Sequence, residues 1–177
     1  RGIDFLGSEH AVLCGAMSWV SERNLVAAIS NGGGFGVIAC GAMTPELLDT
    51  EIAATKALTA KPFGVNLITM HPALFDLIAV CRKHGVTHVV LAGGIPPKGS
   101  VEAIKAFGAK VIVFAPTLAL AKKLLRSGAD ALVIERMSKV FGRYGLKGSS
   151  TGLGRLGMVR NFGMANTIWF LPTRRDQ

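Results

Sequence analysis

The stretch "KVIVFAPTLALAKKLLRSGADALVIE", residues 110–135, decides the fold because it joins two buried strands through one helix. The runs "KVIVFAP" and "ALVIE" are continuously apolar, which is typical of strands that are covered on both faces. Between them, "TLALAKKLLRSG" has the length and the apolar spacing of a helix. A helix of this length between two buried strands predicts a parallel strand–helix–strand unit, closed right-handedly.

The same unit recurs through residues 1–135. Ser21 is predicted to cap the helix that follows the first strand, and Thr44 caps the next one, with Pro45 at its first position. The strand-to-strand spacing of ~20–25 residues is typical of a TIM barrel, with a doubly wound sheet as the structural alternative. The other predicted strands lie within "AVLCGAM" (11–17), 35–40, "KPFGVNLIT" (61–69) and "HVVLAGG" (88–94).

Residues 136–177 have a different character. They carry eight Lys/Arg against one acid and seven glycines, whereas residues 1–135 carry 12 Lys/Arg against 10 acids. We therefore predict an α/β fold: a partial TIM barrel of about six parallel βα units of eight over 1–135, and an irregular, basic tail over 136–177 with a short strand at "NTIWFLP". An incomplete barrel leaves open sheet edges, which suggests a possible homo-oligomer.

Composition limits the class of protein. No apolar run approaches the ~20 residues of a membrane span, and no signal peptide opens the chain. Of the net charge of +9, +7 belongs to the tail, which could bind polyanions nonspecifically, but no motif predicts a dedicated nucleic-acid partner. Three widely spaced cysteines favour a reducing, cytoplasmic location, and no histidine or cysteine spacing indicates a metal site.

In parallel α/β folds ligands bind at the carboxyl ends of the strands, where this chain places mostly small residues. Such ends leave room and backbone N–H groups for a flat cofactor with a phosphate, and Asn66 offers an amide to a heterocycle edge. Ordinary glycine turns with one polar strand end explain the pattern equally well. The residues in question are Gly15, Ala16, Met17, Asn66, Ala92, Gly93 and Glu135.

Several blocks, in order, resemble the FMN-dependent nitronate monooxygenases, formerly called 2-nitropropane dioxygenases, and the related flavin-dependent enoyl-acyl-carrier-protein reductases of type II. They cover about residues 4–135 and include "CGAMSWVSERNLVAAISNGGGFGVIACG", "KPFGVNLIT" and "VVLAGGIPPKGSVEAIKAFGAKVIVFAPTLALAKKLLRSGADALVIE". The resemblance implies a TIM barrel that binds FMN. It places Gly15, Ala16 and Met17 along the flavin ring, Asn66 as a hydrogen-bonding group, Ala92 and Gly93 in the pocket wall, and Glu135 beside the ring.

The chain departs from the family after Glu135. The family's Gly-Gly-His, whose histidine is the catalytic acid/base, is absent, and so are the last two βα units that hold the FMN phosphate. No catalytic residue is therefore assigned. The joint change in charge, periodicity and motif suggests a reading frame broken near codon 136, which the nucleotide sequence would test.

The resemblance implies an FMN oxidoreductase that oxidises alkyl nitronates with O₂, truncated and impaired in this chain. One alternative is an enoyl thioester reductase that uses NAD(P)H. The other is a non-catalytic half-barrel that acts only by self-association or by binding polyanions.

Overall fold

The computed structural model describes residues 1–115, 117–135, 157–162 and 166–170. Six strands alternate with six helices as far as Glu135, and two more strands follow. The helices are α1 (Gly2–Leu6), α2 (Arg23–Asn31), α3 (Pro45–Leu58), α4 (Leu74–Lys83), α5 (Ser100–Lys105) and α6 (Leu118–Arg126). The strands are β1 (Val12–Cys14), β2 (Gly36–Ala39), β3 (Phe63–Ile68), β4 (His88–Ala92), β5 (Lys110–Phe114), β6 (Ala131–Glu135), β7 (Gly157–Phe162) and β8 (Asn166–Phe170).

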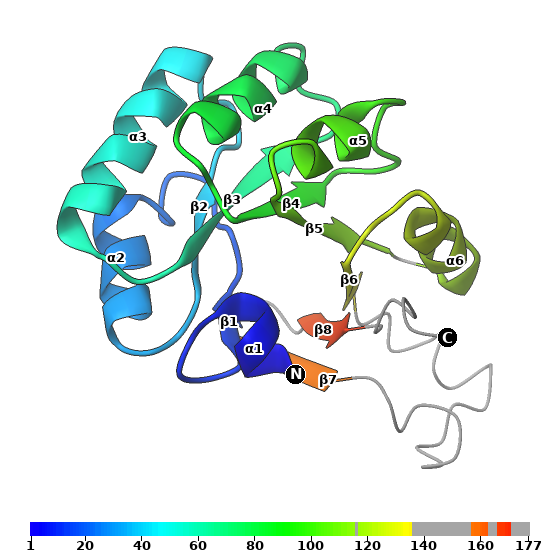
Figure 1. Cartoon of the computed structure of the whole chain (residues 1–177), viewed down its shortest axis with the longest axis horizontal. Helices are drawn as coiled ribbons and strands as arrows, with labels where there is room; N and C mark the ends of the chain where they lie inside the picture. Colours follow the sequence, from blue (N-terminus) through cyan, green and yellow to red (C-terminus); the bar gives the residue numbers. More distant parts are fainter. Residues whose placement is uncertain (116, 136–156, 163–165, 171–177) are drawn as a thin grey trace.

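The sheet contains eight strands in the order β1-β7-β8-β6-β5-β4-β3-β2, and it curves into a ring. Strands β2 to β6 pair in parallel with their neighbours. An isolated parallel bridge between Leu13 and Phe35 joins β1 to β2, where the Phe35 amide donates to the Val12 carbonyl at 2.8 Å. Helices α2 to α6 lie outside the curved sheet (Figure 1). The predicted α/β partial barrel is confirmed.

The C-terminal part differs from the irregular tail that the sequence predicts, because it contains two strands. The short strand expected within "NTIWFLP" is confirmed as β8, which pairs antiparallel with both β6 and β7. Strand β7 pairs in parallel with β1. The edges of β1 and β6, on which the expectation of self-association rested, are thus both paired within the chain.

Two hydrophobic clusters form the core, one on each face of the curved sheet. The larger lies between sheet and helices, where Ile38 and Val65 of the strands belong to the same cluster as Leu48 and Leu77 of α3 and α4. The smaller fills the ring and includes Leu6, Leu13, Phe35, Val37, Val90, Ile112, Ala131 and Val133. Because the strands are buried on both faces, they read as continuous apolar runs in the sequence.

Helix α1 closes the amino end of the barrel. Leu6 is fully buried in the interior cluster, and the Phe5 ring meets the imidazole of His88 edge-on, with centroids 5.4 Å apart. The Phe5 carbonyl accepts a hydrogen bond from His88 Nε2 at 2.8 Å and another from Lys110 Nζ. The interior is therefore sealed at this end, and a ligand for the barrel interior has to approach from the opposite, carboxyl end.

Gly36, the first residue of β2, lies in close contact with α2. A β-carbon at this position would lie 2.5 Å from the Val26 carbonyl oxygen and 2.9 Å from Val26 Cα. Since these are helix backbone atoms, they cannot turn aside, and α2 would have to move off the sheet. We expect Gly36→Ala to lower the free energy of unfolding by about 2 kcal/mol in urea denaturation.

Gly108→Ala is the control for this prediction. Its β-carbon would meet nothing within 4 Å, so only the positive φ of 83° opposes it, at a cost of about 1 kcal/mol. Equal losses for the two variants would contradict the close packing of β2 against α2.

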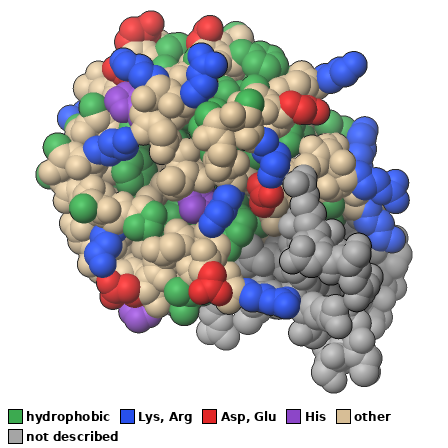
Figure 2. Space-filling model, in the orientation of Figure 1, with side chains coloured by type: hydrophobic (Ala, Val, Ile, Leu, Met, Phe, Trp, Pro, Cys, Tyr) green, Lys and Arg blue, Asp and Glu red, His purple; other side chains and the backbone are tan. Residues whose placement is uncertain are grey.

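The described surface carries charges of both signs. On the face shown in Figure 2, Lys and Arg side chains lie among Asp and Glu side chains over most of the described surface. Within the described residues, no helix is long and apolar enough to cross a membrane. The same part of the chain contains no group of three or more His, Cys, Asp or Glu that could hold a metal ion.

Candidate active site

The carboxyl ends of the strands meet at one mouth of the barrel. Hydrogen bonds connect neighbouring ends: the Cys40 amide donates to the Asn66 carbonyl at 3.1 Å, and the Thr69 amide donates to the Ala92 carbonyl at 2.7 Å. Ala16 and Phe114 pack against the interior cluster from this end. The mouth therefore has an apolar floor, surrounded by the residues that the sequence analysis selected.

The segment Gly15, Ala16 and Met17 is fixed by the buried hydroxyl of Ser21. The Met17 amide donates to Ser21 Oγ at 3.0 Å, and Ser21 Oγ donates to the Gly15 carbonyl at 3.2 Å. The prediction that Ser21 caps α2 is wrong, because Glu22 occupies that position and its carboxylate accepts from the amides of Asn24 and Leu25. The Ser21 side chain is instead committed to shaping the loop after β1.

Thr44, by contrast, caps α3 as predicted. Its hydroxyl accepts from the Leu47 amide at 3.3 Å, and Pro45 opens the helix. The connection from β2 to α3 is thereby held at the same mouth.

Asn66 presents an unused acceptor. Its side-chain Nδ2 donates to the Val90 carbonyl at 3.2 Å, which fixes the orientation of the amide and leaves Oδ1 without a hydrogen-bond partner among the described residues. The residue is only 6% exposed. A side-chain carbonyl oxygen without a protein partner can accept from an N–H donor, such as a heterocyclic ligand would provide.

Strand β4 ends at Ala92, and the connection after it begins with Gly93 and Gly94. Gly93 and Gly94 have φ angles of 93° and 128°, which favour glycine. A β-carbon on Gly93 would lie 3.2 Å from Ile68 Cγ2 and 3.5 Å from Thr69 Oγ1. Thr69 Oγ1 is itself buried and has no hydrogen-bond partner in the described structure. The glycines thus keep a small space beside an unsatisfied hydroxyl, a polar group that the sequence analysis did not select.

Glu135 is the last residue of β6 and is in register with Asn166 of β8. The structure describes its backbone but not its side chain. Asn66 and Ala92 lie on the adjacent strands β3 and β4, and the segment 15–17 follows β1, whereas β5 separates β6 from β4. Residues 136–143, which stand where the resemblance expects Gly-Gly-His, lie outside the described residues.

The three cysteines are free, and their pKa values indicate thiols rather than thiolates. Burial raises the pKa of Cys14 and raises that of Cys40 to about 11. Burial, together with Cys40 nearby, raises the pKa of Cys81 to about 12. None of them is an activated nucleophile at neutral pH, which fits a packing role.

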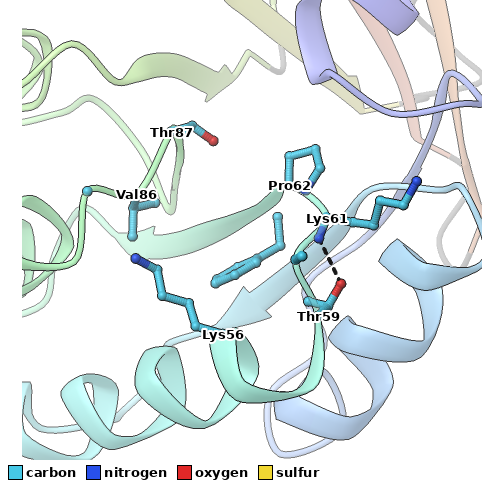
Figure 3. Close-up of a pocket in the computed structure, with 9 residues that line it drawn as sticks. Lys56, Thr59, Lys61, Pro62, Val86 and Thr87 are labelled. Carbon is cyan, nitrogen blue, oxygen red and sulfur yellow. Dashed lines mark hydrogen bonds between the residues drawn. The ribbon is translucent and has the colours of Figure 1, made fainter.

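A pocket of about 320 Å³ lies at the opposite end of the barrel, around the amino ends of β3 and β4 (Figure 3). Its cations are already engaged, because Lys56 Nζ donates to the His84 carbonyl and Lys61 Nζ pairs with Glu9 at 2.8 Å. In (β/α) barrels residues at this end serve stability, while catalysis occurs at the carboxyl face. We therefore place the candidate site at the mouth and not in this pocket.

Comparison with known proteins agrees with the fold. The family profile described as nitronate monooxygenase matches residues 1–156. The chain belongs to the nitronate monooxygenase family. The match extends beyond Glu135, where the quoted resemblance ends.

Curated relatives include dehydrogenases and monooxygenases. A (3aS,4S,5R,7aS)-5-hydroxy-7a-methyl-1-oxo-octahydro-1H-indene-4-carboxyl-CoA dehydrogenase of Mycobacterium tuberculosis is 35% identical over 133 residues, covering 75% of this chain and 37% of that protein. A nitronate monooxygenase of Pseudomonas aeruginosa is 27% identical over 168 residues, covering 73% of this chain and 48% of the relative. The chain therefore spans less than half the length of these relatives.

The chain also spans less than half the length of the solved structures that it resembles. A variant of FabK from Thermotoga maritima superimposes with a TM-score of 0.73 and 39% identity, over 76% of this chain and 46% of FabK. A nitroalkane oxidase of Streptomyces ansochromogenes, at 23% identity and a TM-score of 0.70 over 77% of this chain and 49% of its own, shares the fold. The family is thus one of oxidoreductases.

Proposed function

We propose that this chain binds FMN at the carboxyl mouth of the barrel and belongs to an oxidoreductase that oxidises alkyl nitronates with O₂. The unpartnered Oδ1 of Asn66, fixed by the bond from Nδ2 to Val90, is the observation that carries the proposal. An acceptor in this position suits an N–H group of the flavin pyrimidine edge. Bound FMN would supply the redox chemistry.

The residues around Asn66 fit a flat ring. Gly15, Ala16 and Met17 offer a segment with little side-chain bulk, held by Ser21, and Ala16 continues the apolar floor of the mouth. Gly93 keeps open a space that a β-carbon would fill. These residues would bind and orient the ring, while Glu135, at the end of β6, is proposed from the resemblance alone.

We propose that this chain binds the cofactor but catalyses the reaction slowly. The resemblance places the acid/base histidine within residues 136–143, where the sequence has none. A site that binds flavin without a proton donor or acceptor would hold the cofactor but turn over slowly. The free thiols further support the proposed cytoplasmic location.

A second candidate is an oxidoreductase that acts on an acyl thioester. It is favoured by the 35% identity to a dehydrogenase whose name specifies a carboxyl-CoA compound. The 39% identity to FabK also supports this second candidate, because the sequence blocks resemble the enoyl-acyl-carrier-protein reductases.

Titration of the purified chain with FMN, followed by quenching of flavin fluorescence, tests the shared part of both proposals. We expect saturable binding with one FMN per chain. Nitronate-dependent O₂ uptake and enoyl-thioester-dependent NAD(P)H oxidation then separate the two substrates. A chain that stays folded and never quenches the flavin would refute the proposed function.

A further inference from the structure

One buried hydroxyl group at the mouth of the barrel has no hydrogen-bond partner. Thr69 is 4% exposed, and its Oγ1 is the one fully buried side-chain nitrogen or oxygen atom in the described part of the structure that lacks a partner. Other buried hydroxyl groups are bonded: Ser100 Oγ donates to the Pro97 carbonyl at 2.7 Å, and Thr55 Oγ1 donates to the Glu51 carbonyl at 2.8 Å. A buried hydroxyl without a partner destabilises the folded state, so its presence in Thr69 requires an explanation.

Thr69 lies at the end of the barrel that carries the candidate site. It follows Ile68, the last residue of β3, and stands three residues after Asn66. Its amide donates to the carbonyl of Ala92, the last residue of β4, at 2.7 Å. The backbone of Thr69 is therefore joined to the point at which the connection after β4 begins.

The unpaired hydroxyl lies against the backbone of two glycines. A β-carbon would lie 3.5 Å from Thr69 Oγ1 if it were placed on Gly93, and 3.8 Å from the same oxygen if it were placed on Gly94. Because glycine has no β-carbon, no side chain of the turn separates this hydroxyl from the turn's own backbone. A modest change in the dihedral angles of the turn would thus bring a backbone group onto Oγ1.

The Gly93–Gly94 turn is able to make such a change. The two residues have φ angles of 93° and 128°, and glycine moves between such conformations and the ordinary ones at little steric cost. Neither amide donates to an acceptor in the described part of the structure, so no hydrogen bond from these amides has to break when the turn moves. Unused donors in the turn and an unused hydroxyl oxygen therefore lie close together.

We propose that Thr69 positions the Gly93–Gly94 turn against the bound cofactor. With FMN in the mouth, the turn changes conformation and one of its amides donates to Thr69 Oγ1, which fixes the turn beside the flavin. In the empty protein the turn keeps its freedom, because fixing two glycines costs more conformational entropy than one hydrogen bond offsets. The proposal rests on the proposed function and adds to it a residue that acts through the turn, without touching the ring.

The hydroxyl should therefore affect the empty and the loaded protein in opposite directions. Thr69→Val keeps the shape of the side chain, and without FMN we expect it to raise the urea midpoint by about 0.5 M, because a buried unpaired polar group is removed. With FMN we expect the dissociation constant of this variant to rise roughly tenfold, because the bond to the turn cannot form. Thr69→Ser keeps the hydroxyl and should bind FMN like the wild type.

Hydrogen exchange measured by mass spectrometry follows the turn itself. Saturation with FMN should slow the exchange of the amides of residues 93–95 in the wild type and in Thr69→Ser, and much less in Thr69→Val. Thr55→Val is the matched control, since it makes the same substitution at a buried threonine of α3 whose hydroxyl is already bonded. It should not raise the urea midpoint, and it should leave FMN binding unchanged.

Three results would overturn the proposal. A lower urea midpoint in Thr69→Val would show that the hydroxyl is already bonded in the empty protein, for example to an ordered water. Wild-type FMN affinity in Thr69→Val would show that the hydroxyl does not act in the loaded protein. Equal protection of residues 93–95 in the wild type and in Thr69→Val would show that the turn is fixed without Thr69.

The same FMN titration separates this proposal from the proposed function. If the folded wild type takes up no FMN, the proposed function fails, and the role of Thr69 fails with it. If the wild type and Thr69→Val bind FMN equally, the role of Thr69 fails and the proposed function stands.

Discussion

Lowering the pH from 6.5 to 4 is expected to remove about 3 kcal/mol from the free energy of unfolding through His88 alone. The imidazole is 3% exposed inside the barrel, between the rings of Phe5 and Phe35. Its burial lowers the pKa from 6.5 to about 4, and the charge of Lys110 acts in the same direction. The Phe5 carbonyl and Asp130 oppose the shift without reversing it.

The lowered pKa of His88 decides whether acid stabilises or destabilises the folded protein. The folded protein keeps His88 neutral down to pH 4, while the unfolded chain takes up a proton near pH 6.5. The contribution of His88 to stability is therefore complete above pH 6.5 and is lost as the pH falls toward 4. Because His88 Nε2 bonds the Phe5 carbonyl, the loss also weakens the attachment of α1.

Urea denaturation of the wild type and of His88→Gln, above pH 6.5 and near pH 4, measures the effect. Glutamine can still donate to the Phe5 carbonyl but does not titrate, so the pH dependence should shrink by about 3 kcal/mol. His10→Gln, at an exposed position near the amino end of the barrel, is the control and should retain the full pH dependence of stability. An unchanged pH dependence in His88→Gln would show that the imidazole is not buried as described.

The sequence predicted the parts of the fold that depend on local signals. Alternating buried strands and amphipathic helices gave the barrel, and Thr44 followed by Pro45 gave the start of α3. The rule that ligands bind at strand ends selected Asn66, which the structure places at the mouth with an unused acceptor. The predictions of the barrel and of the start of α3 held because each depends on residues that are near in sequence, whereas the role of Asn66 in binding a ligand stays a prediction.

The parts that the sequence missed depend on distant contacts. Strand β7 pairs with β1 across the whole chain, and the glycine-rich segment that contains it has no alternating pattern to reveal this. His88 begins a strand that is buried on both faces, so periodicity could not show that its side chain enters the ring.

Asn66→Leu is expected to weaken FMN binding about thirtyfold, because it leaves a flavin N–H without an acceptor, at a cost of about 2 kcal/mol. Leucine branches at Cγ as asparagine does, so it occupies a similar position while both the acceptor and the bond to Val90 disappear. Fluorescence quenching of FMN gives the dissociation constant, and urea denaturation of the apoprotein shows whether the variant remains folded. Asn24→Leu, on the exposed start of α2, is the matched control and should bind FMN like the wild type. A folded Asn66→Leu protein with wild-type affinity would remove Asn66 from the flavin site, and the proposal would then rest on the glycine-lined ends of β1 and β4 alone.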